Sequence, residues 1–379
     1  MDLLIQHNVL MLRAEAEVKA KVLALLIPMQ KDIVGVLASA PALSELDKAG
    51  KSALLRKSNA LIADYYGRAQ LVADLGAMAQ VEALGVHSAL STVIEARIGV
   101  GMPTENYLVS DTLMLGSPAR TWWLRQQQDT AFELATQIRI GAAQGETNAQ
   151  IVARVVGTDE IPGVMPMARK NALSTVQTSM AGVAAAARRA TFEMNRHLMT
   201  AIEQVSTMDG HSGLMCIAYG GAQWDLHYEP MGENHLQSND GVPRHHGCRS
   251  TEIAVMKIFR EMGIDLDEPE EGARASSSGP ISAKTTFADY LTMKGADYQN
   301  EVLGPGRAAL FREGKLAPRD LVNMSGRPLK LSASRRCTRS RVASAHDIPP
   351  EIPAGVADAA RAAGVTQAHG YRRSRGRAG

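Results

Sequence analysis

Apolar residues recur at helical spacing through the first hundred positions of the chain. Pro28 interrupts the pattern, so we expect the first helix to kink or split there. After Pro41, Ser44 suits a helix N-cap, and the pattern predicts a further helix to about Gln80 that residues 81–98 continue. These stripes are typical of a bundle core, and an oligomerisation surface is the alternative for some faces. The first stripe consists of Val18, Val22, Leu25, Leu26, Met29, Ile33, Val36 and Leu37.

The middle of the chain predicts three more helices joined by loops. Residues 99–118 contain Gly and Pro and break the helical pattern. One helix is expected over residues 120–145, and a short one over residues 147–156 with Thr147 as its N-cap. The longest helical signal extends over residues 167–206.

Beyond this point the elements become shorter. Residues 251–263 predict a strand followed by a helix. Residues 266–284 are acidic, then rich in Ser and Gly, which is the composition of a linker. A small helical module is expected at 285–331, with Thr285 capping its first helix. Residues 332–379 hold almost no large apolar side chain and are predicted to be disordered.

The expected fold is mainly α with a small α+β central domain. An N-terminal helical region (1–110) precedes this central domain (111–265), which contains a Cys/His-containing loop motif after the long helix. The linker (266–284), the C-terminal helical module (285–331) and a basic tail (332–379) complete the chain.

Composition and charge support this fold and exclude several classes of protein. An aromatic content of 4% favours helices over a β-sandwich. Three cysteines cannot form a multi-disulfide framework and indicate reducing conditions. We recognise no signal peptide and no apolar run long enough to span a bilayer, so we expect a soluble protein made in a cytoplasm. From Arg335 onward, nine arginines and three acidic residues give a net charge of about +6.

Residues 203–252 concentrate the side chains that carry chemistry, with five of the ten histidines and two of the three cysteines. His245, His246 and Cys248 could supply two ligands from one turn of chain, and Cys216 could help to complete a tetrahedral zinc site. Neither the segment around Cys216 nor the segment from His245 to Cys248 has the C-x-x-C spacing of a strong zinc motif. Two alternatives stay open: a Cys216–Cys248 disulfide, and a hydrogen-bonded network within a buried loop.

Evidence for catalysis in the sequence is weak. Asp209, His211 and Cys216 can be written as a thiol–histidine–acid set, but closeness along the chain does not supply the spatial geometry. The sequence contains no H-E-x-x-H motif, no phosphate-binding Gly-rich loop after a strand and no prominent pair of carboxylates. We therefore expect no enzymatic activity, with a thiol hydrolase acting through Cys216 as the alternative.

Two signatures in the central stretch resemble those of a known family. A long Arg- and Thr-containing helix leads into V-S-T-x-D-x-x-x-x-x-x-C, and P-x-H-H-x-C-R-S follows after a spacer with a tryptophan. This order resembles the phage Mu F-like head-morphogenesis family, the minor capsid proteins of tailed bacteriophages. The matching positions are Val205, Ser206, Asp209, Cys216, Gly220, Trp224, Pro243, His245, His246, Cys248, Arg249 and Ser250.

The resemblance covers about residues 115–331. Segments 141–157 and 168–195 resemble the family's helical approach to the motif, and the C-terminal module carries V-L-G-P-x-R-x-x-L-F-R-x-G-K-L. Many relatives have a second cysteine where this chain has Tyr219, and some end the motif in C-R-C where it has Ser250. These departures lower the case for a four-thiolate metal site and leave a mixed Cys/His site or a hydrogen-bonded network.

The resemblance implies a structural role in head assembly, at the portal vertex or in the capsid interior. The expected partners are the portal protein and the major capsid protein, and a homo-oligomer is compatible with this role. The expected location is the virion, with the host cytoplasm during assembly. The residues expected to form the structural motif are Asp209, Cys216, Trp224, Pro243, His245, His246, Cys248 and Arg249.

Some relatives bind DNA or travel with it, which gives the basic tail a candidate partner in genome packaging or delivery. Its arginines could neutralise phosphates of packaged DNA without sequence preference, and a solvated tail with no partner is the alternative. A Zn-stabilised nucleic-acid-binding protein is a further alternative for the whole chain. The candidate DNA-binding residues are Arg335, Arg336, Arg339, Arg341, Arg372, Arg373, Arg375 and Arg377.

Overall fold

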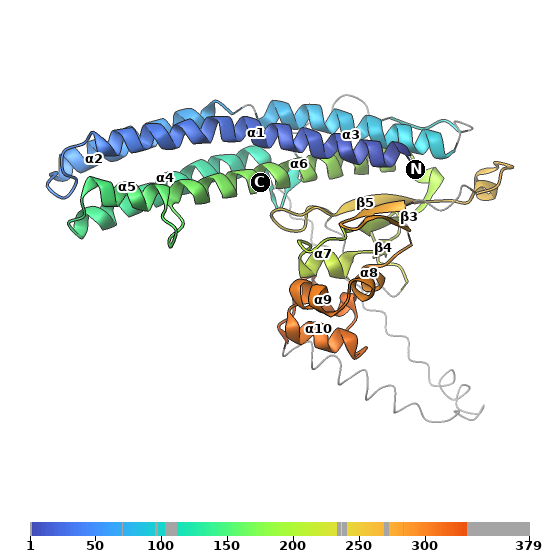
Figure 1. Cartoon of the computed structure of the whole chain (residues 1–379). Coiled ribbons are helices and arrows are strands. Elements are labelled where there is room, and N and C mark those ends of the chain that lie inside the picture. The colour runs from blue at the N-terminus through green and yellow to red at the C-terminus, as the bar shows by residue number, and fades with distance from the viewer. Residues whose placement is uncertain are drawn as a thin grey trace, which may run out of the picture. The chain divides into compact units, whose positions relative to one another are not determined.

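The computed structural model describes residues 2–69, 71–94, 98–102, 112–232, 236, 241–268, 273–282 and 284–331. Met1–Lys330 forms one compact unit, in which a bundle of long helices adjoins a small sheet and a group of short helices (Figure 1). The tail predicted to be disordered lies outside the described residues. Among the described residues, no helix combines the length and apolar character needed to cross a membrane.

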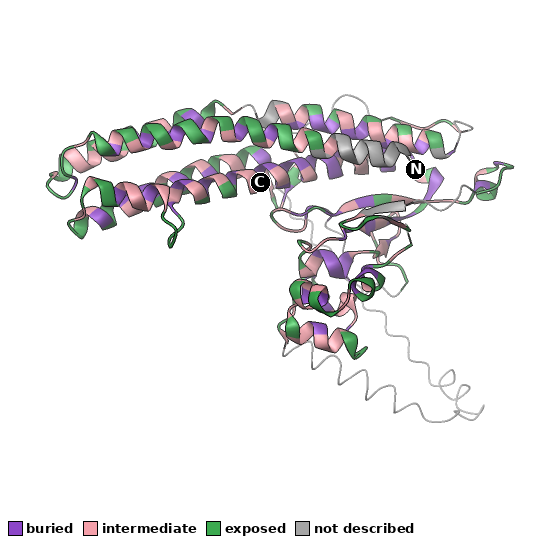
Figure 2. Ribbon diagram, in the orientation of Figure 1, coloured by how far each residue is buried: buried purple, intermediate pink, exposed green. Residues whose placement is uncertain are grey.

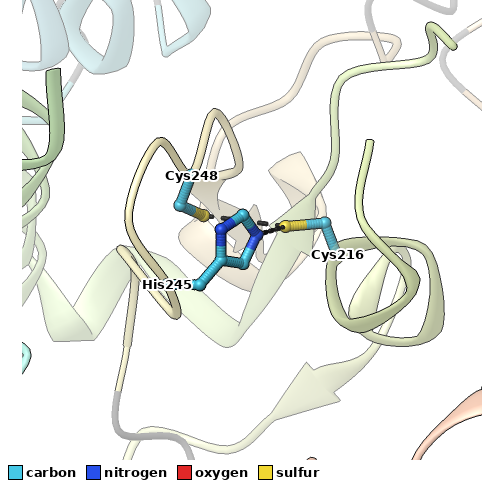
Figure 3. Close-up of side chains that lie close together, drawn as sticks. All are labelled: Cys216, His245 and Cys248. Atoms are coloured by element: carbon cyan, nitrogen blue, oxygen red, sulfur yellow. Dashed lines mark hydrogen bonds between the residues drawn. The ribbon is translucent and has the colours of Figure 1, made fainter. Parts of the chain in front are cut away.

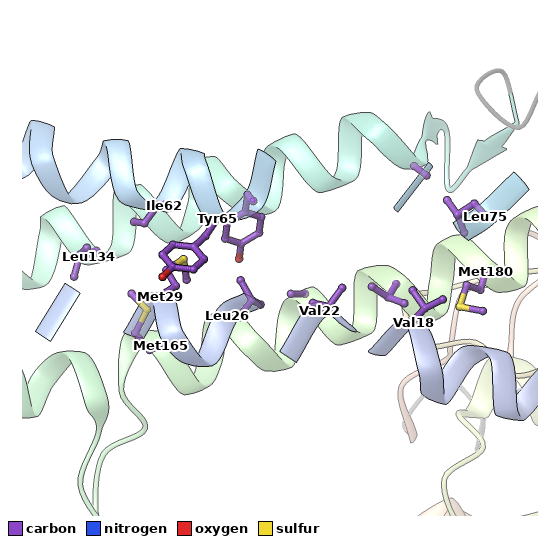
Figure 4. Packing of buried hydrophobic residues seen from close by; sticks show 14 of the residues in the cluster. Val18, Val22, Leu26, Met29, Ile62, Tyr65, Leu75, Leu134, Met165 and Met180 are labelled. Carbon is purple, nitrogen blue, oxygen red and sulfur yellow. The ribbon is translucent and has the colours of Figure 1, made fainter. Parts of the chain in front are cut away.

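The long helices form a bundle whose apolar stripes make one core. The helices are α1 (Asp2–Ala38), α2 (Lys48–Gly67), α3 (Leu71–Val93), α4 (Ala119–Ala143), α5 (Asn148–Val156) and α6 (Val164–Met194). α1 packs against α2, α3, α5 and α6, and α4 packs against α2, α5 and α6. Leu26 and Met29 of α1 are buried in one cluster with Ile62 of α2 (Figure 4), and Ile33 of α1 belongs to the same cluster. Residues on the outward faces of the same helices are exposed (Figure 2).

Helix α1 continues through Pro28, so the predicted split is wrong. A proline inside a helix costs about 3 kcal/mol or more, because it removes one backbone hydrogen bond and crowds the preceding turn. Leu26 and Met29 on either side of Pro28 are each 1% exposed. Burying such side chains contributes about 1.5–3 kcal/mol each, which offsets the cost of the proline.

The start of α2 also differs from the prediction. Its N-cap is Asp47, whose side chain accepts a hydrogen bond from Gly50 N at 2.7 Å, rather than Ser44. α2 ends at Gly67, so the single helix predicted to reach about Gln80 is two helices, α2 and α3.

The short helix α5 has the predicted N-cap and holds a distant turn in place. Thr147 Oγ1 accepts a hydrogen bond from Gln150 N, and the Gln150 side chain accepts one from Thr147 N at 2.8 Å. Asn148 Nδ2 donates to Ala40 O at 2.9 Å, and its Oδ1 accepts from Leu43 N at 3.0 Å. α5 therefore fixes the turn that joins α1 to α2.

The loop between α5 and α6 is closed at its neck. Thr158 N donates to Ile161 O at 2.9 Å across the loop. Gly157 has φ +91°, and a Cβ added at Gly163 would lie 2.1 Å from Gly157 N. The two ends of the loop therefore touch through backbone atoms that only glycine leaves room for.

Helix α6 ends at Met194, so the predicted helix over residues 167–206 is wrong in its last part. Asn195 stops the helix, because its Oδ1 accepts from Gly101 N and its Nδ2 donates to Thr191 O, both at 2.7 Å. Strand β3 (Met199–Val205) follows, and it is rich in β-branched residues that favour a strand.

Strand β3 is the middle strand of an antiparallel sheet with the order β4-β3-β5. Ile202 pairs with Trp224 on one side and with Ala254 on the other. The strand predicted near residue 251 is confirmed as β5, and the helix predicted after it is a short 3-10 turn. The elements around β3 are η2 (Arg196–Leu198), β4 (Gln223–Trp224), β5 (Thr251–Met256) and η3 (Phe259–Met262).

Two small hairpins complete the strands. The first joins β1 (Leu113–Met114) to β2 (Ser117–Pro118), and the second joins β6 (Ala273–Ser276) to β7 (Gly279–Ser282). The second hairpin lies in the segment whose composition predicted a linker. Ser277 N donates to Met208 O at 3.0 Å, and this contact from another part of the chain anchors the hairpin.

The C-terminal module is helical, in agreement with the sequence. It consists of α8 (Phe287–Lys294), α9 (Ala296–Leu303), α10 (Pro305–Arg312) and the 3-10 turn η4 (Pro318–Leu321). The N-cap of α8 is Thr286, which forms a capping box with Asp289, rather than Thr285. The module shares its core with Ile217 of α7 (Leu214–Tyr219) and with Trp224 of β4. The fold is thus mainly helical with small antiparallel sheets, as the sequence predicts.

Two neighbouring arginines of α6 form ion pairs with buried carboxylates on different elements. Arg188 pairs with Glu82 of α3, which is 0% exposed. Arg189 donates through Nε and Nη2 to the two oxygens of Glu252 on β5, each at 2.7 Å, and its guanidinium lies over the Tyr228 ring. Successive helical residues point about 100° apart, so one turn of α6 is fixed to the bundle and to the sheet.

We expect Arg188→Ala to lower the free energy of unfolding by about 3–5 kcal/mol, because Glu82 stays buried after losing its arginine. Urea unfolding measures the change. Arg125→Ala is the matched control, since Arg125 and Asp129 form an exposed pair on α4, and we expect it to have little effect. Similar decreases in the free energy of unfolding of the two variants would contradict the expected contribution of the buried Arg188–Glu82 pair.

Candidate metal-binding site

The site lies where the last residue of β3 pairs with the first residue of β5. Val205 pairs with Thr251, so the residue after Val205 and the residue before Thr251 become neighbours. Accordingly the hydroxyls of Ser206 and Ser250 are 3.2 Å apart. Helix α7 begins shortly after Ser206, and Ser206 Oγ donates to Cys216 O. Strand pairing thus brings Cys216 beside the loop that precedes β5.

Three side chains predicted as metal ligands meet at this point: Cys216, His245 and Cys248. Cys216 Sγ lies 2.9 Å from His245 Nε2 and 3.7 Å from Cys248 Sγ (Figure 3). The three potential ligand atoms all lie within 4.8 Å of one another. Cys216 is 4% exposed and Cys248 is 1% exposed. Both are free thiols in this structure, so the alternative Cys216–Cys248 disulfide is not formed.

The backbone around His245 orients its imidazole ring for ligation. Cys248 N donates to His245 O at 3.1 Å, and this turn places the two side chains on one side of the loop. His245 Nδ1 lies 2.9 Å from the carbonyl oxygen of His246, which can only accept a hydrogen bond. A neutral ring therefore carries its proton on Nδ1, and Nε2 presents a lone pair toward Cys216. Bonds of this kind fix the tautomer of metal-binding histidines.

The two thiols have different acidities. A hydrogen bond from Cys248 lowers the pKa of Cys216 to about 7, although burial acts in the opposite direction. The side chain of Ser250 and the positive charges of Arg244 and Arg249 also lower it. The same bond to Cys216, together with burial, raises the pKa of Cys248. Near neutral pH the pair can therefore hold one thiolate, which is the form of cysteine that binds metals.

The donor set and the sulfur spacing fit a zinc ion. Two thiolates bound to one tetrahedral zinc at about 2.3 Å lie about 3.8 Å apart, and the two sulfur atoms here are separated by 3.7 Å. Thiolate and imidazole are ligands that zinc prefers. The 2.9 Å between Cys216 and His245 is shorter than two ligands of one ion require, so the ring has to draw back slightly on binding.

His246 and His211 lie outside this group of ligands. His246 is exposed, and its ring meets the ring of Trp122 edge-on with centroids 5.0 Å apart. His211 is also exposed. Asp209 pairs with Arg249 rather than with a histidine, so the acid and the thiol of the candidate catalytic set have different partners.

Asp209 and Arg249 form a second link between the same two loops. Arg249 Nη2 donates to Asp209 Oδ1 at 2.6 Å, and Nη1 donates to the other carboxylate oxygen. Thr207 Oγ1 donates to Arg249 O at 2.9 Å. Partial burial tends to raise the pKa of Asp209, but hydrogen bonds from Arg249 and from His211 N outweigh it and hold this pKa below its usual value.

Arg244 and Tyr219 are part of the site although the sequence did not single them out as functional. The Arg244 guanidinium lies 3.6 Å from the centroid of the Tyr219 ring, and its Nε donates to the Gln204 side chain. The Tyr219 ring in turn stacks on the buried Trp224, with centroids 6.0 Å apart. For Arg244 the signal in the sequence was its position between Pro243 and His245 in the motif, and for Tyr219 it was the position at which many relatives have a cysteine.

The cluster is not part of the cavity at the other end of the bundle. That cavity, of about 600 Å³, lies between α4, α5 and the start of α6, and its lining includes Gln126, Arg154 and Met167. None of the three cluster residues lines it.

Comparisons of the chain with protein-family models, with curated protein sequences and with solved structures find no match. The candidate DNA-binding arginines, from Arg335 to Arg377, lie outside the described residues, and their role stays a prediction.

The Asp209–Arg249 pair predicts how stability depends on pH. An acid whose pKa is lowered by folding stabilises the folded chain above its unfolded pKa, and this contribution is lost as the pH falls through the folded pKa. Between about pH 5 and about pH 3, wild-type protein should therefore lose more stability than Asp209→Asn. Urea unfolding at both pH values measures the difference. Asp159→Asn, at an exposed loop position, is the control and should follow the wild type. Parallel curves for wild type and Asp209→Asn would exclude a stabilising pair.

Proposed function

We propose that this chain is a minor structural and assembly protein of a tailed-phage head, acting at the portal vertex or in the capsid interior. One observation carries the proposal: the two signatures on which the resemblance rests converge in space. Asp209 and Cys216 of the first contact Arg249, His245 and Cys248 of the second. Residues matched only by chance along the sequence would have no reason to meet, so their convergence supports a shared motif.

The character of the site supports assembly without turnover. Both sulfur atoms belong to buried residues, and the Asp209–Arg249 pair and the Ser206–Ser250 contact tie together the same loops. Groups arranged in this way stabilise loops that have no regular secondary structure of their own. Portal and major capsid proteins are the proposed partners, and non-specific contact of the tail with packaged DNA is proposed as a secondary interaction.

A thiol hydrolase is the second candidate, and one observation favours it. Cys216 has a pKa of about 7 and lies 2.9 Å from His245 Nε2, as an activated cysteine does. Its exposure of 4% opposes this reading, because a nucleophile has to reach its substrate. An activity that disappears in a folded Cys216→Ser variant would favour the hydrolase.

We further propose that the buried Cys216, His245 and Cys248 bind zinc. The ion would join α7 to the loop before β5 and stabilise the folded motif. Three protein ligands leave one coordination position, which a water molecule fills in comparable sites.

The assembly role predicts a physical association with the head. Full-length protein should co-purify with the portal or major capsid protein of its own phage, when these are expressed together. Arg249→Ala should weaken the association, because it removes the pair with Asp209 and loosens the proposed motif. Arg125→Ala, on the exposed face of α4, is the matched control and should behave as wild type.

Cryo-electron microscopy of the portal vertex locates the chain independently of the co-purification. Failure to recover either partner, together with a virion that lacks the chain, would overturn the assembly role.

The zinc proposal predicts about one ion per chain and an affinity that depends on pH. Each thiol has to release its proton when the metal binds. Because the pKa of Cys216 is about 7 and that of Cys248 is raised, both thiols are protonated below pH 7, and the affinity should fall about a hundredfold per pH unit there. Elemental analysis measures the content, and competition with a chromogenic chelator from pH 8 to pH 6 measures the affinity.

Adjacent histidines supply a matched control for the zinc site. His245→Ala should lose the metal, whereas His246→Ala should keep it, because His246 contacts Trp122 and not the cysteines. Cys337→Ser, outside the described residues, should also keep it. Less than about 0.1 zinc per wild-type chain would remove the site from consideration.

A further inference from the structure

Helix α7 contacts two parts of the molecule, the Cys216/His245/Cys248 cluster and the C-terminal module. It has only six residues, and the last four of them, Cys216 to Tyr219, are buried. Cys216 belongs to the Cys216/His245/Cys248 cluster, whereas Ile217 and Tyr219 belong to the core of the C-terminal module. A helix this short is unstable alone, so its geometry depends on what holds it from outside.

On the side of the module, α7 packs against η4 and the residues that follow it. Leu321 and Val322 are 1% and 2% exposed, in one cluster with Ile217 and Tyr219. The contact is close at Gly326, where an added Cβ would lie 2.2 Å from the Tyr219 hydroxyl oxygen. The turn at Gly326 is therefore shaped around the tyrosine.

On the side of the cluster, the same tyrosine is held by the loop that carries His245. The Arg244 guanidinium lies 3.6 Å from the centroid of the Tyr219 ring, and Arg244 directly precedes His245. A movement of this loop is thus passed to Tyr219 along two routes, through the Cys216 ligand contact and through Arg244.

The C-terminal module is small, so its stability depends on the contact with α7. The core of a chain of fewer than about 70 residues rarely supplies more than about 3–5 kcal/mol, and this module spans residues 284–331. Part of its core is supplied by α7 and by Trp224 of β4. If α7 loosens, the module loses one wall of its core and should open locally before the rest of the protein does.

We propose that α7 couples the Cys216/His245/Cys248 cluster to the docking of the C-terminal module, so that metal binding at the cluster closes the module onto the sheet. The proposal rests on the zinc site proposed above. The module, which directly precedes the C-terminal tail in the sequence, then acts as a metal-controlled element. Loss of the ion frees residues 284–331 while the helical bundle stays folded.

Hydrogen exchange of the full chain, with zinc and with a chelator, tests the coupling. If the module opens only after the metal has left, zinc at 100 times its dissociation constant should slow module exchange by up to about 100-fold. The amides of α8, α10 and η4 should respond although none of these elements carries a ligand. Amides in the middle of α1 should not respond, and they serve as the internal reference.

Two variants separate the coupling from simple stabilisation. Tyr219→Ala leaves all three ligands in place, so it should bind zinc but lose most of the zinc-dependent protection of the module. Met293→Ala, at a module side chain that is 69% exposed, should keep both binding and protection. His245→Ala should show rapid module exchange with or without zinc, and His246→Ala should resemble wild type.

The outcomes distinguish the coupling from the site. Zinc uptake with unchanged module exchange would overturn the coupling and leave the metal site standing. A chain that takes up no zinc overturns both. Equal module protection in Tyr219→Ala and wild type would show that α7 is not the connecting element.

Discussion

The fold depends on two charges placed side by side on one helix. Arg188 and Arg189 of α6 meet buried carboxylates on α3 and on β5, and each carboxylate would be costly to bury without its arginine. Both ion pairs form together only when α6 keeps one rotation about its axis and one position along it. The pairs therefore hold α6 against the bundle and the sheet, and Asn195 then ends the helix before β3 begins. Apolar packing alone would be more tolerant, because Ala-rich faces slide past each other with small changes in contact.

The candidate site inherits its geometry from that placement. Antiparallel pairing of β3 with β5 brings together Ser206, which follows β3, and Ser250, which precedes β5. The ligands lie on the loops and on the short helix α7 just beyond these two residues. The long helices therefore hold the sheet in place, and the pairing of its strands aligns the loops that carry the ligands. The residues around Cys216 need no long secondary structure of their own. Their order comes from contacts between segments that are 29 to 44 residues apart along the chain.

Local signals in the sequence predicted most helices, but they placed two N-caps wrongly, at Ser44 instead of Asp47 and at Thr285 instead of Thr286. The cap at Thr147 and the helices around it follow from short-range rules, and the Cys/His grouping was visible as composition. The predictions were also wrong where contacts between distant parts of the chain determine the secondary structure. Strand β3 follows an Ala-rich helix and reads as its continuation, and only pairing with β4 and β5 turns it into a strand. The hairpin near Ser277 has the composition of a linker but is anchored by Met208. Spacing alone also could not choose between His245 and His246, because a carbonyl and a tryptophan ring, both seen only in three dimensions, make that choice.

The closed neck of the loop between α5 and α6 offers a practical handle. Its ends, Gly157 and Gly163, already touch, so a longer segment inserted between them leaves the bundle with the same end points. The entropic cost of enlarging a surface loop grows only slowly, by about 0.6 kcal/mol for each doubling of its length. An epitope or a small fluorescent domain inserted at this tip would mark one end of the bundle, far along the chain from the cysteines. Such a label would allow a direct search for the chain in phage heads, the location proposed for it, without disturbing the part of it proposed to bind metal.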